Sequence, residues 1–148
     1  PWQEGGYFNR PTDVAIDEDT GDIFVSDGYG NSRIHKFNSE GDHIKSWGKS
    51  GSENGEFSLP HNISIFDNNK IALCDRENFR VQIFDFDGNY LDQWHFHRPI
   101  AIYSDQYSKE IYVAAPPRII PDFKEGVSIE SKARVPITNI FLHPLLRF

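Results

Sequence analysis

The chain has 148 residues, a formal net charge of −7 and a pI near 5.3, which is the size of one ordinary domain with an acidic balance. This charge argues against a nucleic-acid backbone or an anionic membrane surface as the main partner, and no apolar run approaches the ~20 residues that span a bilayer. Cys74 is the single cysteine, so an internal disulfide is excluded. Because the sequence starts at Pro1 without an initiator methionine, we expect it to be cut or processed there.

Two sets of four short strands are predicted in the first two thirds of the chain. They cover residues 13–17, 22–27, 33–38 and 43–47, and then residues 63–66, 71–75, 80–84 and 90–94. The runs are rich in Ile, Val and Phe, and turn formers separate them. Alternation is clear in the seventh run, where Val81 and Ile83 share one face. No window shows convincing helical periodicity, so the sequence predicts an all-β fold of four-stranded antiparallel blades.

The last part of the chain follows this pattern less well. Residues 111–113 keep the place of a second strand, but Pro116, Pro117 and Pro121 occupy the following turn and third strand. Because proline cannot donate to a β ladder, that third strand is predicted to be an edge strand or lost. Residues 132–148 show no repeat and are predicted to be an irregular tail.

A proline opens each segment, at Pro11, Pro60 and Pro99, with spacings of 49 and 39 residues. Periods near 40–50 residues with several short strands are typical of propeller arrays. The predicted blades cover residues 8–58, 59–97 and 98–131, and residues 48–57 form a loop between the first two. Closed propellers need four to eight blades. Residues 1–131 are therefore predicted to be an incomplete propeller, and the chain expressed alone is expected to self-associate through its open edges or to be partly unfolded.

The position after each of these prolines holds three unrelated side chains, Thr12, His61 and Ile100, so packing does not dictate the residue there. This position opens the innermost strand of a blade and borders the central channel, where several blades can aim one side chain each at a common point. A lone histidine is more often a surface or hydrogen-bonded residue than a ligand. The position nevertheless makes His61 a candidate metal ligand.

The turn after the second strand also varies between repeats. It follows a recurring aspartate, Asp27 or Asp75, and the recurrence indicates a structural role in satisfying the amides of the turn. The turn then carries Tyr29 in the first repeat and Arg76 in the second. We expect both side chains to lie on the same rim as His61, with simple stacking over the rim as the alternative.

Two glycines, Gly28 and Gly30, flank Tyr29. Glycine tolerates backbone conformations that other residues avoid. We therefore expect these glycines to place the phenol in a strained turn.

The tandem segments resemble NHL repeats, which form β-propellers. The strings DGYGNSRI, LPHNI and DRENFR together resemble the catalytic core of peptidyl-α-hydroxyglycine α-amidating lyase, over residues 8–94 and weakly to 113. This resemblance implies a six-bladed propeller with a zinc ion held by histidines from separate blades, and a structural calcium ion in the channel. It implies that His61 is a zinc ligand, Tyr29 a catalytic residue and Arg76 an active-site arginine.

The implied reaction cleaves the C–N bond of a peptidyl-α-hydroxyglycine and releases a peptide amide and glyoxylate. Zinc with an open coordination position can polarise substrate oxygens. A tyrosine is normally a weak base, but a dication and Arg76 would stabilise its phenolate, so Tyr29 could take the substrate's hydroxyl proton. The other zinc histidines and a further arginine of the family belong to blades that this sequence lacks. The chain alone is therefore expected to be inactive and to bind little zinc.

Other interpretations stay open. The parent protein could be a non-catalytic NHL propeller that binds a peptide or small ligand on its rim, since fold does not fix function. The chain could also be a truncated or frameshifted product. Gly30 stands where the animal lyases carry a disulfide-bonded cysteine, which points toward the bacterial branch or toward relatives without proven activity. The sequence does not reveal the compartment, although a secreted or periplasmic location is slightly favoured.

Four further histidines are assigned to structural or surface roles. His95 and His97 share one face of an extended segment, as a metal pair would, but their place at the outer end of a blade favours a structural role. His35 and His43 are predicted to be exposed strand residues.

Overall fold

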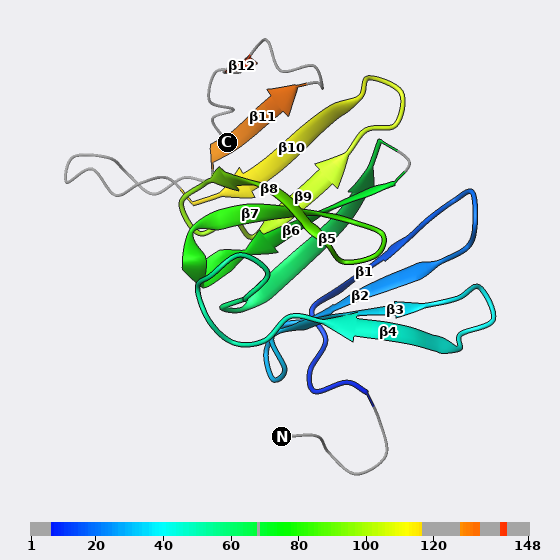
Figure 1. The fold of residues 1–148 in the computed structure, drawn as a ribbon. Helices are drawn as coiled ribbons and strands as arrows, with labels where there is room; N and C mark the ends of the chain where they lie inside the picture. Colours follow the sequence, from blue (N-terminus) through cyan, green and yellow to red (C-terminus); the bar gives the residue numbers. More distant parts are fainter. Residues whose placement is uncertain (1–6, 68, 117–127, 134–139, 142–148) are drawn as a thin grey trace.

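The computed structural model describes residues 7–67, 69–116, 128–133 and 140–141, and Figure 1 shows their strands in three sheets. Each sheet has four antiparallel strands in chain order. The predicted all-β fold of four-stranded antiparallel blades is therefore confirmed. Within the described residues, no helix has the length and apolar character needed to cross a membrane.

The first two sheets, blades 1 and 2, follow the sequence closely. Blade 1 contains β1 (Asp13–Ile16), β2 (Ile23–Asp27), β3 (Arg33–Phe37) and β4 (His43–Trp47), and blade 2 contains β5 (Pro60–Phe66), β6 (Lys70–Asp75), β7 (Arg80–Asp85) and β8 (Tyr90–His95). A single 3-10 turn, η1 (Arg76–Asn78), connects β6 to β7. Strand β5 starts three residues before the predicted run, because Pro60 already pairs with Asp75 ahead of a shift in register.

Blade 3 differs from the prediction in its outer strands. It contains β9 (Ala101–Ser104), β10 (Glu110–Ala115), β11 (Ser128–Ala133) and β12 (Ile140–Phe141). The third strand is neither lost nor at the prolines: β11 follows them and pairs with β10 along its whole length. A ladder strand needs donating amides, which prolines lack, so pairing resumes only beyond them.

The division into an incomplete propeller up to residue 131 and an irregular tail stays a prediction. Strand β11 spans this boundary, and β12, within the predicted tail, pairs with β11. Residues 134–139 and 142–148 of that tail lie outside the described residues.

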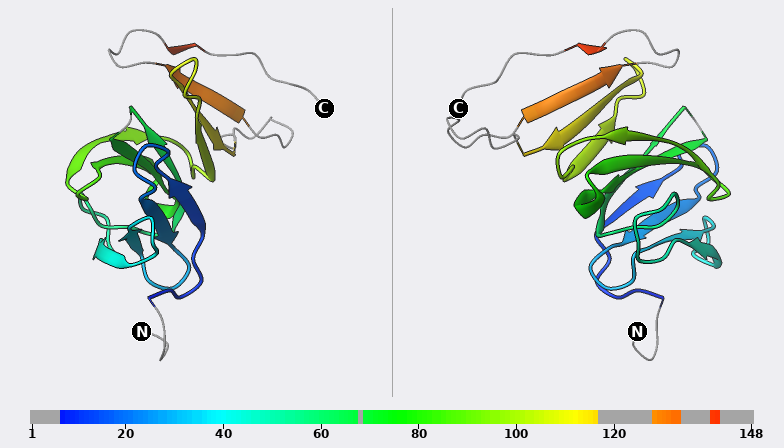
Figure 2. Two further views of the ribbon diagram at one scale, coloured as in Figure 1. Left: turned by 90° about the vertical axis from the view of Figure 1, so that its right-hand side faces the viewer. Right: turned by 60° about the vertical axis from the view of Figure 1, so that its left-hand side comes forward.

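The three blades pack face to face in chain order, as Figures 1 and 2 show. Alternate residues of β6 serve the two interfaces, since successive strand residues point to opposite faces. Ile71 and Leu73 pack toward blade 1, whereas Ala72 and Cys74 pack toward blade 3. Burial in this second interface raises the pKa of the Cys74 thiol, so it serves as a packing residue and not as a nucleophile.

The residue before each repeated proline has the same unusual backbone conformation. Arg10, Leu59 and Arg98 have φ values of 62°, 60° and 46°, in the left-handed region that non-glycine residues rarely adopt. Side chains as different as arginine and leucine are held in this conformation, so the entry loop is set by the fold. The loops that lead into the three innermost strands are therefore structurally equivalent.

Polar side chains fix the innermost strands β1, β5 and β9 side by side. The carboxylate of Asp13 accepts hydrogen bonds from the side chain of Asn62 and from the amide of Ile63, the latter at 3.0 Å. The amide oxygen of Asn62 in turn accepts a hydrogen bond from the amide of Ile102 at 2.5 Å. Because Asn62 follows His61 directly, this chain of bonds positions the start of β5 relative to both neighbouring blades.

Candidate functional site

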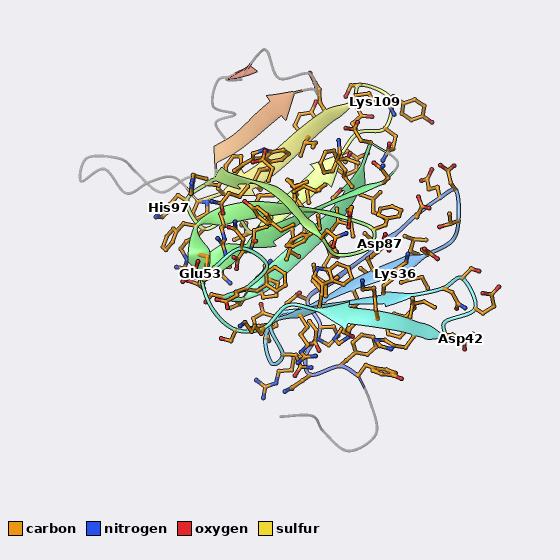
Figure 3. The ribbon with its side chains drawn as sticks, in the orientation of Figure 1. Lys36, Asp42, Glu53, Asp87, His97 and Lys109 are labelled. Atoms are coloured by element: carbon orange, nitrogen blue, oxygen red, sulfur yellow. The ribbon has the colours of Figure 1, made fainter. Side chains whose placement is uncertain are left out.

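The predicted site residues come from connections at one end of the strands. The amide of Tyr29 donates to the Arg10 carbonyl at 3.4 Å, and the amide of Arg76 donates to the Leu59 carbonyl at 3.3 Å. These bonds bring the turns after β2 and β6 beside the loops that enter the innermost strands. Figure 3 shows His97 and Glu53 toward this rim, and Asp42, Asp87 and Lys109 toward the opposite end of the sheets.

Tyr29 and His61 meet across the boundary between blades 1 and 2. The phenolic oxygen of Tyr29 lies 3.4 Å from Nε2 of His61, and the two ring centroids are 6.1 Å apart with the planes at 79°. Tyr29 is 53% exposed and His61 is half-buried, so a ligand on the rim can reach the phenol. Two residues separated by 32 positions in the sequence thus form a single polar pair.

The tautomer of His61 follows from its second contact. Its Nδ1 lies 2.7 Å from the carbonyl oxygen of Ile100, which can only accept a hydrogen bond. Nδ1 of His61 therefore carries the proton in the neutral ring, and Nε2 presents a lone pair toward Tyr29. This is the arrangement by which ligating histidines are commonly oriented, with one nitrogen held by a carbonyl and the other free for a metal.

The role of Gly28 is close packing and not backbone strain. Neither Gly28 nor Gly30 has a positive φ, so the predicted backbone role of these glycines is wrong; the left-handed residue of this turn is Ser32, at φ 52°. A Cβ atom on Gly28 would lie 1.9 Å from the carbonyl oxygen of Pro60. The absence of a side chain lets the turn carrying Tyr29 press against the residue before His61.

Replacing Gly28 with alanine is therefore expected to destabilise the chain by about 1–3 kcal/mol, because a backbone oxygen must move to make room. Urea unfolding measures the change. Gly41→Ala is the control, since a Cβ there meets no atom within 4 Å and only the positive φ of 87° opposes it, at about 1 kcal/mol. A smaller loss for Gly28→Ala than for Gly41→Ala would contradict the packing role.

Arg76 lies at the same rim, but its charged partner is Glu77. Nε of Arg76 is 3.4 Å from a carboxylate oxygen of Glu77, and the same oxygen accepts a hydrogen bond from Arg98 at 2.5 Å. Within the described part of the chain, Nε of Arg76 has no hydrogen-bond partner despite its burial. The structure thus brings Tyr29 and His61 together and places the Arg76 guanidinium in an ion pair beside blade 3.

The two recurring aspartates have the structural role expected from their recurrence. Asp75 is fully buried and accepts hydrogen bonds from the Ser58 amide at 2.7 Å and from Arg80 at 2.8 Å. Asp27 is also fully buried and accepts a hydrogen bond from the Asn9 amide at 2.9 Å. Each carboxylate therefore fixes the loop that enters its own blade, close to the rim.

The four other histidines among the described residues have different environments. His35 is fully buried and not exposed as predicted, because it turns inward toward Asp27 at the end of β2. His43 is half-buried and hydrogen-bonded to Ser46 at 2.8 Å. His95 is exposed at the end of β8, and His97 contacts Phe79 in a tilted arrangement, with centroids 5.5 Å apart and the ring planes at 47°. In the part of the chain that the structure describes, no group of three or more His, Cys, Asp or Glu residues could hold a metal ion.

The sequence match supplies the family of the repeats. The model described as "NHL repeat" matches residues 8–37 and 57–84, which contain β1 to β3 of blade 1 and β5, β6 and most of β7 of blade 2. The chain carries NHL repeats. Both matches begin at the phenylalanine of a Phe-x-x-Pro sequence, Phe8 or Phe57, and Phe96 precedes Pro99 in the same way.

Curated relatives of this NHL-repeat chain include proteins named for peptide amidation. It is 42% identical over 92 residues to the peptidyl-glycine alpha-amidating monooxygenase of Mus musculus, covering 59% of this chain and 9% of that protein. It is 44% identical over 87 residues to a probable peptidyl-alpha-hydroxyglycine alpha-amidating lyase of Caenorhabditis elegans, covering 57% and 25%. It is also 33% identical over 90 residues to NHL repeat-containing protein 3 of Homo sapiens, covering 59% and 26%. The chain thus spans a quarter or less of the length of the two amidation relatives.

Solved structures extend the likeness in fold to 90% or more of the chain. The NHL-repeat chain superposes on a structure titled Kuenenia stuttgartiensis hydrazine synthase with a TM-score of 0.68 and 13% identity, over 93% of this chain and 37% of that one. It superposes on the WD40 repeats of RRP9 with a TM-score of 0.67 and 16% identity, over 90% and 38%. At these identities the comparison concerns the fold alone, which is propeller-like.

Asn62 is a site residue that the sequence reasoning missed. It follows His61 and bonds to both neighbouring innermost strands. A comparison of the repeats could have found it, because the second residue after each repeated proline is Asp13, Asn62 or Ala101. A pair of polar side chains at equivalent positions of two adjacent blades is what a bond between blades requires.

Proposed function

We propose that this chain is the middle part of a propeller that cleaves a peptidyl-α-hydroxyglycine to a peptide amide and glyoxylate. The observation that carries the proposal is the Tyr29–His61 pair at 3.4 Å, with Nδ1 of His61 fixed on the Ile100 carbonyl. The relatives named as amidating lyases support it, because two of them are 44% and 39% identical to this chain over 57% and 62% of its length.

In this proposal Tyr29 is the base. Its phenolate oxygen takes the proton of the substrate hydroxyl, and the C–O bond becomes the aldehyde of glyoxylate as the C–N bond breaks. The electron pair of the C–N bond goes to the amide nitrogen, which takes a proton back from Tyr29. No electrons are gained or lost overall, so no redox partner is needed. The exposure of Tyr29 on the rim is consistent with access for a peptide chain end.

His61 fits the role of a zinc ligand in its chemistry, since its Nε2 lone pair is directed away from the Ile100 carbonyl. When bound, a zinc ion with an open position polarises substrate oxygens. A single histidine does not complete such a site, and the remaining ligands would come from blades outside this sequence. A structural calcium ion stays a prediction from the family resemblance.

Arg76 is proposed to stabilise negative charge on the rim. Its present partner, Glu77, is shared with Arg98, so two guanidinium groups surround one carboxylate. A substrate carboxylate could therefore attract Arg76 without leaving Glu77 unpaired. This role depends on movement of a side chain whose Nε has no hydrogen-bond partner among the described residues.

The test is an assay on a complete propeller that contains this chain. We expect release of glyoxylate and peptide amide in equal amounts from a model α-hydroxyglycine peptide, loss of this activity with a chelator, and recovery with zinc. Glyoxylate release no faster than in buffer, after zinc is added, would contradict the lyase proposal.

A second candidate is a non-catalytic NHL propeller that binds a peptide on the same rim. The likeness to NHL repeat-containing protein 3 favours it. A peptide that binds the complete propeller without being cleaved would support this alternative. We also propose self-association of the chain through its open edges, because Val14, Ile16 and Tyr103 on the inner strands are 53%, 58% and 64% exposed.

A further inference from the structure

The recurring buried aspartates, Asp27 in blade 1 and Asp75 in blade 2, have chemically different hydrogen-bond partners. In blade 2, Asp75 accepts hydrogen bonds from Arg80 at 2.8 Å and from Gln82 at 2.9 Å. In blade 1, the place of Gln82 is taken by His35, whose Nε2 lies 3.4 Å from Asp27. The register confirms the equivalence, since both residues sit opposite the position two before the aspartate. A titratable ring thus replaces an amide that cannot titrate.

His35 shares a serine hydroxyl with a second histidine. Nδ1 of His35 is 2.7 Å from Oγ of Ser46, and Nε2 of His43 is 2.8 Å from the same oxygen. With Nε2–H of His35 donated to Asp27, Nδ1 must accept the Ser46 proton, and Ser46 then accepts from His43. A proton added to Nδ1 of His35 would remove the acceptor of Ser46 and force this chain of bonds to reverse.

The charged and titratable groups that face His35 come from every element around it. They are Asp27 at the end of β2, Arg33 on β3, His43 on β4, and Tyr7 from the segment before β1. Asp27 favours a proton on the ring, whereas Arg33 and His43 oppose it. Burial is the largest influence and lowers the pKa of His35 below its ordinary value of 6.5.

A short segment covers His35 and leads to the turn that carries Tyr29. Tyr7 stacks on His43 with centroids 4.1 Å apart, and Phe8 meets the His35 ring edge-on at 5.4 Å. The amide of Asn9 donates to Asp27 at 2.9 Å. The next carbonyl, that of Arg10, accepts the amide of Tyr29. Residues 7–10 therefore connect the buried ring to the candidate site.

We propose that His35 is a proton-sensitive positioning residue: its neutral form holds residues 7–9 closed on blade 1, and its protonation releases them together with the Tyr29 turn. The inference concerns the regulation of the site proposed above, and its link to catalysis rests on that proposed function. The closure of residues 7–9 on blade 1 does not depend on that proposed function.

The direction of the effect follows from burial and charge. The protonated ring needs water, which it gains when Tyr7 and Phe8 lift away. The ring centroids of His35 and His43 are 6.2 Å apart, so two positive charges there repel each other. Because its folded pKa is lowered, His35 costs no stability above about pH 6.5. Stability is lost as the pH falls from there to the folded pKa, and then levels off.

The test is an NMR titration of this chain, without zinc or substrate. We expect the His35 ring to titrate below about pH 6.5, and the amide resonances of Asn9 and Tyr29 to move with the same midpoint. His95→Gln, at an exposed histidine, is the control, and it should leave the pH response of both amides unchanged. Amides that stay fixed, or that follow a different histidine, would overturn the proposal.

The substitution His35→Gln gives blade 1 the glutamine that blade 2 has at the equivalent position. In this variant the Asn9 and Tyr29 amides should no longer respond to pH. The wild type should lose about 3–5 °C more in Tm than the variant between about pH 7.5 and 5.5. An equal loss in both proteins would overturn the proposal, and if the variant does not fold, the wild-type titration decides. A failed lyase assay would leave all these readouts intact, so the two proposals fail separately.

Discussion

Replacing Tyr29 with phenylalanine in a complete propeller is expected to lower kcat/KM for a model α-hydroxyglycine peptide by about 10²–10⁴-fold. The change keeps the edge-on contact with His61, with centroids 6.1 Å apart, and removes only the oxygen 3.4 Å from Nε2. Since the ring is 53% exposed, the loss of its hydroxyl should change stability by no more than about 0.5 kcal/mol. Steady-state glyoxylate release measures the effect.

Tyr103→Phe is the matched control for this prediction. Tyr103 is 64% exposed on β9, and it is not part of the Tyr29–His61 pair. We expect this variant to retain wild-type kcat/KM, whereas His61→Ala should lose activity together with zinc. Full activity of Tyr29→Phe would show that the phenol is not the base.

Asp75→Ala is expected to destabilise the chain by about 3–5 kcal/mol, a large part of the 5–15 kcal/mol typical of a domain. The carboxylate is fully buried and holds Arg80, which is 6% exposed, and Gln82. Its removal leaves the guanidinium charge without its counterion. Arg80 also donates to the Glu53 and Glu56 carbonyls at 2.9 and 3.0 Å, so the loop between blades should loosen too.

Urea unfolding of this chain measures the loss, with Asp92→Ala as the control. Asp92 is exposed on β8, and its replacement should change stability by no more than about 0.5 kcal/mol. If Asp75→Ala unfolded at the same urea concentration as Asp92→Ala, the Asp75 network would not be a stabilising element of blade 2.

The strands of blades 1 and 2 could be predicted because their signals are local. Alternating Val81 and Ile83 mark the apolar face of a strand whatever its neighbours are, and turn residues mark its ends. Strand β11 could not be predicted in the same way, because it pairs with β10 only after a segment rich in proline. No local sequence pattern indicates how many residues separate β10 from β11.

The candidate site was predictable in its position and less so in its contacts. Repeat register placed Tyr29, His61 and Arg76 on one rim, since equivalent positions of adjacent blades lie side by side. It could not show that Arg76 and Arg98 share the carboxylate of Glu77, because Arg98 comes from the next blade.

The burial of His35 was missed for a related reason. In a strand, alternation assigns a face, but whether that face is covered depends on Tyr7 and Phe8 from another segment. A comparison with Gln82 at the equivalent position of blade 2 could have raised the question. Both misses involve contacts between blades or segments and not patterns within a strand.

The site depends on His61 directing an unprotonated Nε2 toward the phenol of Tyr29. Long-range ¹H–¹⁵N correlation on this chain, at about pH 8 where an ordinary histidine is neutral, reads the tautomer directly. We predict a proton on Nδ1, bonded to the Ile100 carbonyl, and an unprotonated Nε2. A proton on Nε2 would contradict it, because that nitrogen could then neither bind a metal ion nor accept the Tyr29 hydroxyl.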